Sequence, residues 1–150
     1  MESTQTKSFN PVRGIFDLKI YDANGDLIEH YVDENTVVNQ GKQGLTALLG
    51  GTLTGDKTIT DIMFGVDGTP AAVTDTGMIG YSKALAATSF PADNSVQFDF
   101  VLEITESNGS TIRDFGLINA DGDLFARKVR TGGIVKTSDI RLEGSWTIVF

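Results

Sequence analysis

Two acidic turns are the parts of this sequence whose residue types and spacing could do chemistry. The stretch "DANGDL" spans residues 22–27 and "NADGDL" spans residues 119–124, and each lies between apolar runs. Carboxylate and amide side chains alternate in both, as the first ligands of a calcium loop do. The turns could therefore hold a metal ion, hold a polar substrate, or only reverse the chain.

The calcium interpretation requires more than alternating oxygen ligands. A calcium loop also needs glycine at its sixth position and a bidentate glutamate at its twelfth. Here Leu27 and Leu124 take the sixth position, and Asp33 and Arg130 take the twelfth. An arginine cannot ligate a cation, so the sequence predicts no metal site.

The hairpin interpretation explains more of the first turn, because Asn-Gly tolerates the positive φ that tight turns require. A two-residue loop would pair Ile20 with Glu29. A three-residue loop, residues 23–25, would instead pair Ile20 with Ile28 and Lys19 with Glu29. Cross-strand pairs stabilise a sheet by roughly 0.2–1 kcal/mol each, so we predict the second register.

The same rule applied to the second turn places its loop at residues 120–122. It pairs Leu117 with Phe125 and Ile118 with Leu124, two apolar pairs. One register rule thus suits both copies, and we interpret their acids as turn-forming and solvated.

Other catalytic patterns are weak or missing in the sequence. The chain has one histidine, His30, within an expected strand, and it has no cysteine and no G-x-S-x-G motif. The stretch "GGTLTGDKT" lacks the spacing of a phosphate loop. We therefore predict no catalytic residues, no cofactor and no enzymatic activity, and a glycan hydrolase using two carboxylates is the least favoured alternative.

Composition favours one globular domain. The chain has 150 residues, a net charge of −8 and 40% hydrophobic residues, enough for a core without disulfides. The only basic cluster, Arg127, Lys128 and Arg130, is too small to predict direct nucleic-acid binding, and no apolar run is long enough for membrane insertion. The polar start "MESTQTKSFNP" lacks the apolar core of a signal peptide. We expect a flexible N-terminal arm at residues 1–11 and a single domain at residues 12–150.

Period-two alternation predicts the fold class, an all-β, mostly antiparallel β-sandwich with one short α-helix. The expected helix spans residues 42–49, with Asn39 as a candidate cap and Gly50-Gly51 as its end. We expect loops at residues 49–58, 66–77 and 90–95. The expected strands are residues 14–21, 26–38, 58–66, 79–88, 95–105, 111–119, 123–130 and 140–150.

Aromatic residues divide into two groups by their position in these strands. Seven lie on apolar strand faces and are expected in the core: Phe64, Phe98, Phe100, Phe115, Phe125, Trp146 and Phe150. Three tyrosines are expected nearer the surface, where they could anchor a protein partner or stack on a sugar: Tyr21, Tyr31 and Tyr81.

Three stretches taken together resemble a known family. They are "NTVVNQGKQGLTALLGG", "ITDIMFGVDGTPAAVTDTGM" and "TIRDFGLINADGDLFARKV", the last followed by "KTSDIRLEGSWTIVF". Their order is similar to that in small structural proteins of tailed bacteriophages. The stretch from Ile112 to Arg127 resembles the attachment domains of tail-fibre and tail-collar proteins and related baseplate components. The resemblance covers roughly residues 35–150.

The resemblance implies a virion protein made in the host bacterial cytoplasm. It would be a non-enzymatic tail, baseplate or collar subunit that forms a trimer or ring with itself and binds other phage tail or capsid proteins. A capsid decoration protein, or a receptor- or carbohydrate-binding module of the tail, is the alternative. We expect the interface to use Phe115, Arg127 and Arg130 of the second hairpin, together with Tyr81 and the N-terminal arm.

Overall fold

A computed structural model describes residues 12–51 and 55–150, so the predicted arm lies outside the described residues. Within them the chain forms strands and one helix, and every strand pairing is antiparallel. The mostly antiparallel β fold with one short helix is confirmed. The elements are β1 (Arg13–Asp22), β2 (Leu27–Val37), α1 (Asn39–Gly50), β3 (Ile59–Gly65), β4 (Gly80–Ala84), β5 (Ala87–Ala92), β6 (Ser95–Leu102), β7 (Thr111–Asn119), β8 (Leu124–Val135) and β9 (Ile140–Val149).

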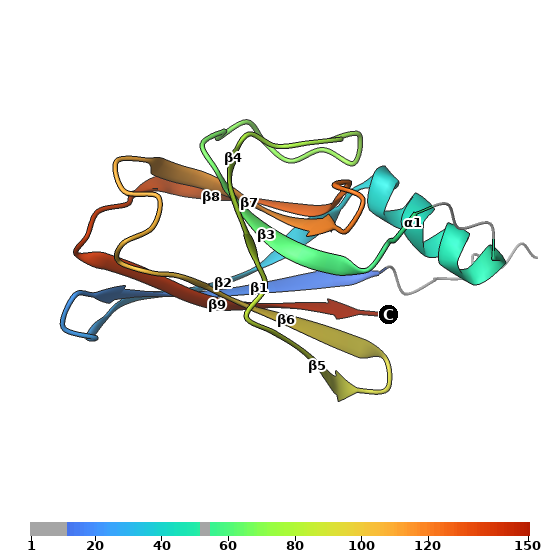
Figure 1. Cartoon of the computed structure of the whole chain (residues 1–150), viewed down its shortest axis with the longest axis horizontal. Helices are drawn as coiled ribbons and strands as arrows, with labels where there is room; N and C mark the ends of the chain where they lie inside the picture. Colours follow the sequence, from blue (N-terminus) through green and yellow to red (C-terminus); the bar gives the residue numbers. More distant parts are fainter. Residues whose placement is uncertain (1–11, 52–54) are drawn as a thin grey trace, which may run out of the picture.

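The strands form one sheet in the order β4-β3-β7-β8-β2-β1-β9-β6-β5, which curls until its two halves face each other (Figure 1). Strand β2 makes one corner, since it pairs with β1 along its length but with β8 only at Thr36 and Val37. The link between β4 and β5 makes the other. The amide of Leu85 donates to Thr60 in one layer, and that of Ala86 donates to Asp99 in the other. Strands that change layers are a known way to build such corners.

This second corner corrects our single strand at residues 79–88. The chain leaves one layer and enters the other at residues 85–86, so two short strands replace the expected one. Strand β5 also runs through part of "FPADNS", which the sequence analysis assigns to a loop at residues 90–95. Proline is tolerated there because β5 lies at the edge of the sheet.

The core lies between the two layers. Rings from opposite layers meet there, with centroids 4.7 Å apart for Phe16 and Phe115 and 5.9 Å apart for Phe64 and Phe100. Aromatic pairs at such distances add to the stabilisation from burial. Six of the seven aromatic residues expected in the core are buried: Phe64, Phe98, Phe100, Phe115, Phe125 and Trp146. Phe150 is the exception, since half of it is exposed.

The helix begins three residues before the expected start and ends at Gly50, one residue after the expected end, with Gly51 as its C-cap. Asn39 is its first residue and not its cap; Val38 takes the cap position without a side-chain hydrogen bond. Gly41 allows the helix to pack closely, because a Cβ there would collide with the carbonyl oxygen of Phe125. Among the described residues, α1 is the sole helix, and it lacks the length and apolar character to cross a membrane.

Both acidic turns are hairpin turns with the predicted three-residue loops. In the first, the amide of Asp22 donates to the Asp26 carbonyl at 2.9 Å, and Gly25 has a φ of 85°. The Asp22 carboxylate accepts hydrogen bonds from the amides of Asn24 and Asp26. In the second turn Gly122 has a φ of 88°. The glycines thus occupy backbone conformations that other residues rarely adopt.

The register beyond the first loop differs from our prediction. Ile20 pairs with Glu29, and Lys19 pairs with His30, because Ile28 is an extra residue in β2. Such a β-bulge shifts every later pair by one residue. The predicted pairs Ile20–Ile28 and Lys19–Glu29 are therefore wrong.

The second hairpin contains the same irregularity. Ile118 pairs with Leu124 as predicted, but Leu117 pairs with Ala126 and not with Phe125. The bulge interrupts the alternation of faces, and consecutive residues from Leu124 to Arg127 are all buried. Both hairpins therefore share one pattern, a three-residue loop followed by a bulge, and the bulge is the part that we did not predict.

Candidate interaction interface

The four residues expected at the interface do not share one surface. Phe115 is 0% exposed and packs in the core, and Arg127 is 3% exposed. Both side chains are therefore buried within the subunit and do not lie on the surface where we expected them. Arg130 and Tyr81 are partly exposed, and their contact with a partner stays a prediction.

Arg127 lies at the centre of a buried ionic network. Its Nε donates to Asp114 Oδ2 at 2.9 Å and its Nη1 to Asp75 Oδ2 at 3.0 Å, while Nη2 donates to the Asp67 carbonyl at 3.2 Å. Burial raises the pKa of Asp114, and the hydrogen bond from Arg127 opposes that rise. Arg127 therefore fastens the loop between β3 and β4 to strands β7 and β8.

Arg130 joins the two strands of the β2 corner. Its guanidinium pairs with Glu29 and lies 5.6 Å from the ring centroid of Tyr31, while Lys128 Nζ lies 2.7 Å from Asp33 Oδ2. Strands β2 and β8 share only two paired positions. These side chains thus bridge the strands where the backbone ladder is absent.

Tyr81 is 38% exposed but makes an internal hydrogen bond from its hydroxyl to Glu106 Oε2 at 2.8 Å. Lys83 Nζ lies 2.6 Å from the other carboxylate oxygen. Partial burial alone would raise the pKa of Glu106, but hydrogen bonds from Lys83, the Glu103 amide and Tyr81 lower the pKa to about 2. The cluster ties β4 to the loop after β6.

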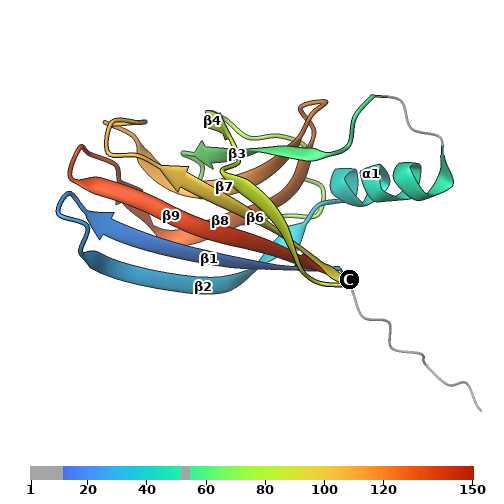
Figure 2. The same cartoon turned by 60° about the horizontal axis from the view of Figure 1, so that its bottom comes forward.

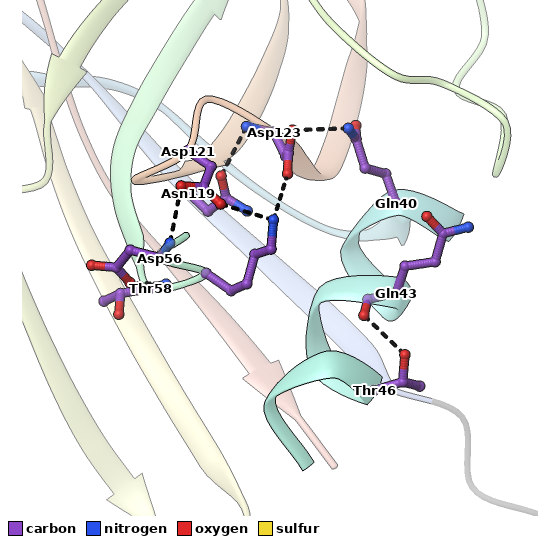
Figure 3. A network of polar contacts seen from close by, with 9 residues as sticks. Gln40, Gln43, Thr46, Asp56, Thr58, Asn119, Asp121 and Asp123 are labelled. Carbon is purple, nitrogen blue, oxygen red and sulfur yellow. Dashed lines mark hydrogen bonds and ion pairs between the residues drawn. The ribbon is translucent and has the colours of Figure 1, made fainter. Parts of the chain in front are cut away.

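The acids of the second turn face an ammonium group. Lys57 Nζ lies 2.8 Å from Asp121 Oδ2 and 3.1 Å from Asp123 Oδ2, and these hydrogen bonds raise the pKa of Lys57. Asp123 also accepts a hydrogen bond from Gln40 of α1 at 3.0 Å, and Asp121 accepts one from the Asp56 amide (Figure 3). This turn therefore holds both α1 and the entry to β3.

The metal alternative finds no cluster to support it in residues 12–51 and 55–150. No group of three or more histidine, aspartate or glutamate side chains there is arranged to hold a metal ion. The single histidine is exposed on β2, where its Nε2 lies 2.8 Å from Asp17 Oδ1.

Lys136 is a buried cation that sequence analysis missed. It is 0% exposed, and its Nζ donates to Asn108 Oδ1 at 2.8 Å and to the Thr137 carbonyl at 3.0 Å. Burial lowers the pKa of Lys136, against the nearby charges of Glu106 and Glu103. The lysine joins the β6–β7 loop to the β8–β9 connection.

An apolar cleft of about 560 Å³ lies where α1 meets the open end of the two layers. Figure 2 shows α1 projecting past the strands at this end, near the C-terminus of the chain. The helix contributes one wall, and strands β5, β6 and β9 contribute the other. Its apolar lining includes Leu45, Leu48, Phe90, Phe98, Ile148 and Phe150.

The rim of this cleft exposes large apolar side chains. Phe90 is 77% exposed on β5, Phe150 is half exposed, and Leu48 is exposed on α1. Phe150 and Asn94 exchange two hydrogen bonds, from Phe150 N and from Asn94 Nδ2, which hold the end of β9 against the β5–β6 turn. The cleft is thus the described surface best suited to bind an apolar group.

Part of this site can be recognised in the sequence, and the rest cannot. The helical spacing of Leu45, Leu48 and Leu49 was recognised. Phe90 was missed because "FPADNS" is typical of a loop, and Phe150 was assigned to the core. Only the side-by-side placement of α1, β5 and β9 brings these residues together.

Comparisons with protein-family models, with curated proteins and with solved structures gave no match for this chain.

Proposed function

We propose that this chain is a non-enzymatic structural subunit of a bacteriophage virion, which assembles with copies of itself and connects other components of the tail, baseplate or collar. The observation that supports self-assembly most directly is the apolar cleft with its exposed rim. The virion setting rests on the resemblance of residues 112–127 to tail-fibre and tail-collar attachment domains.

The exposed apolar rim of the cleft favours binding of a protein partner, because a partner that covers the rim removes this apolar surface from water. Full burial of a leucine or phenylalanine side chain contributes about 1.5–3 kcal/mol. Leu48, Phe90 and Phe150 surround one cleft and are not isolated surface residues. Exposed apolar groups gathered in this way are typical of interaction sites.

The neighbouring edge strand favours contact through side chains. All six residues of β5 are exposed, and β5 is the last strand of the sheet. Such an edge can pair with a strand of another chain. Pro91 lacks an amide donor and so restricts that pairing. A partner that inserts an apolar side chain into the cleft would contact the exposed side chains of β5 without needing a backbone hydrogen bond from Pro91.

The alternative of a carbohydrate-binding module gains less support. Tyr31 lies beside Lys128 and Arg130, and the hydroxyl of Tyr81 is bonded to Glu106. These rings are engaged within the subunit. A capsid decoration protein would use the same cleft, and electron microscopy of labelled virions distinguishes capsid from tail.

Mass photometry and light scattering test the proposal on the full chain. We expect a discrete oligomer for the wild type and dissociation of the double variant L48Q/F90S. The matched control is Val135→Thr, since Val135 is exposed on β8 and does not line the cleft. A wild-type chain that stays monomeric at high concentration and binds no virion protein would refute the proposal.

A further inference from the structure

We propose that the cleft binds the N-terminal segment, residues 1–11, of a neighbouring copy, with Phe9 as the inserted side chain. The inference rests on the proposed self-assembly and names the partner of the same site. It depends on the chemistry of the cleft, on the sequence of the segment and on the place where the described chain begins.

The cleft is large enough to hold an aromatic side chain together with parts of the residues beside it. Its volume of about 560 Å³ lies within the range of sites that enclose small molecules. Leu45 and Leu48 form one wall, and Phe90, Phe98 and Phe150 offer ring faces and edges for aromatic contact. The charged residues Lys57 and Asp93 also border the cleft. They could contact the polar residues that flank the inserted Phe9.

The segment "MESTQTKSFNP" contains one aromatic residue, Phe9, within a polar stretch. An aromatic anchor flanked by polar residues is a common arrangement at interface hot spots. The segment has one Glu and one Lys, so it brings no net side-chain charge to an apolar site. Met1 is its only other large apolar residue.

The segment joins the described chain at the end of the molecule that holds the cleft. Arg13 at the start of β1 pairs with Val149 at the end of β9, and Val149 also pairs with Ser95 at the start of β6. Figure 2 shows these strand ends converging beside the C-terminus. Copies that meet at this end would therefore bring segment and cleft together.

The segment of the same chain starts beside the β9 side of the cleft, because Ile148 lines the cleft and pairs with Gly14 of β1. The far side of the cleft, at Phe90, is harder for it to reach, whereas the segment of a second copy is not tied to β1 of the same subunit. Phe90 lies on β5, three strands from β1, or about 14 Å at the usual strand spacing. Two residues, Asn10 and Pro11, separate Phe9 from Val12, so the Cα atoms of Phe9 and Val12 lie at most about 10 Å apart.

Each copy would then donate one segment and accept another. Donor and acceptor surfaces differ, so the contact is heterologous and closes into a ring if the rotation between copies allows it. This agrees with the trimer or ring expected from the resemblance.

Disulfide trapping tests the inference directly, because the chain contains no cysteine. Phe9→Cys and Leu48→Cys are placed in separate chains, mixed and oxidised, and covalent dimers are quantified on non-reducing gels. We expect the mixed pair to form at least about ten times more dimer than the control pair Phe9→Cys with Val135→Cys. Phe9→Ala should weaken association about 10- to 100-fold, and Phe9→Trp should retain it.

The outcomes separate this inference from the proposed function. If the double variant F9C/L48C forms its disulfide within one chain, the own segment covers the cleft and the inference is wrong. If the wild type assembles but the mixed pair does not exceed its control, the inference fails while self-assembly stands. A wild type that stays monomeric at high concentration overturns this inference, and if it also binds no virion protein, the proposed function fails as well.

Discussion

Arg127 donates a hydrogen bond from Nε to Asp114 Oδ2 at 2.9 Å, and both side chains are buried on the adjacent strands β7 and β8. A buried ion pair contributes little compared with apolar packing, but removing one partner leaves an uncompensated charge. The pair therefore makes the stability of the fold depend on a residue that sequence analysis assigns to a surface.

Arg127→Met is expected to destabilise the protein by about 3–5 kcal/mol, because Asp114 stays buried without its cation. Urea denaturation followed by tryptophan fluorescence measures this change. Arg113→Met is the matched control, since Arg113 is exposed on the same strand as Asp114, and we expect a change within about 0.5 kcal/mol. Equal effects of the two substitutions would contradict the role of the ion pair.

Glu106 should make stability depend on acid pH. The pKa of its carboxyl group is about 2 in the folded protein, against an ordinary value of 4.5 for a solvated glutamate. The stabilisation is therefore present above pH 4.5 and is lost as the pH falls from 4.5 towards 2, by roughly 2–3 kcal/mol. Glu106→Gln should flatten this part of a stability profile measured by urea titration. A variant that retains the full acid dependence would assign it to other carboxylates.

Lys136 should make the stability of the protein depend on pH in the alkaline range. Burial lowers its pKa below 10.5 in the folded protein, so the unfolded chain binds the proton more tightly. Stability should rise as the pH increases towards 10.5. Lys136→Met removes this pH dependence. At neutral pH the substitution should either destabilise the protein by less than about 1.5 kcal/mol or stabilise it. Thermal unfolding between about pH 7 and pH 10 measures both, and a strong loss of stability would show that the charged amine is needed.

Two glycines of α1 provide a matched test of helix packing. A Cβ at Gly41 would collide with the Phe125 carbonyl, whereas the nearest atom to a Cβ at Gly44 is 3.8 Å away on Lys57. Gly44→Ala should stabilise the protein by about 0.5–1 kcal/mol through helix propensity. Gly41→Ala should destabilise it and displace α1 from β8, which would also alter the cleft. Chemical denaturation compares the two, and similar stabilisation by both would contradict the close approach.

Calcium should leave the thermal midpoint unchanged, because Asp121 and Asp123 already face Lys57. A ligand stabilises a protein only when it binds the folded state more tightly. Differential scanning fluorimetry in calcium chloride or EDTA at about 5 mM, a concentration that would fill even weak extracellular sites, measures the midpoint. A calcium-dependent rise that Asp121→Asn removes would restore the metal alternative.

The sequence by itself determined most of the strands, the helix and the two hairpin loops. Period two identifies which side chains share a strand face, as in β6, where Phe98, Phe100 and Leu102 are buried. Gly25 and Gly122 identify turns because few other residues adopt their positive φ. These features depend on neighbours within a few residues, and a local pattern records them.

Tertiary structure alone decided the register, the corners and the site. The bulges at Ile28 and Phe125 shift the pairing after correct loops, and the change of layer at residues 85–86 divides one expected strand. Arg127 is buried although it is charged, and Phe90 and Phe150 surround a cleft. Burial depends on the second layer that covers a face, and that layer comes from residues far along the chain, so no local pattern specifies it.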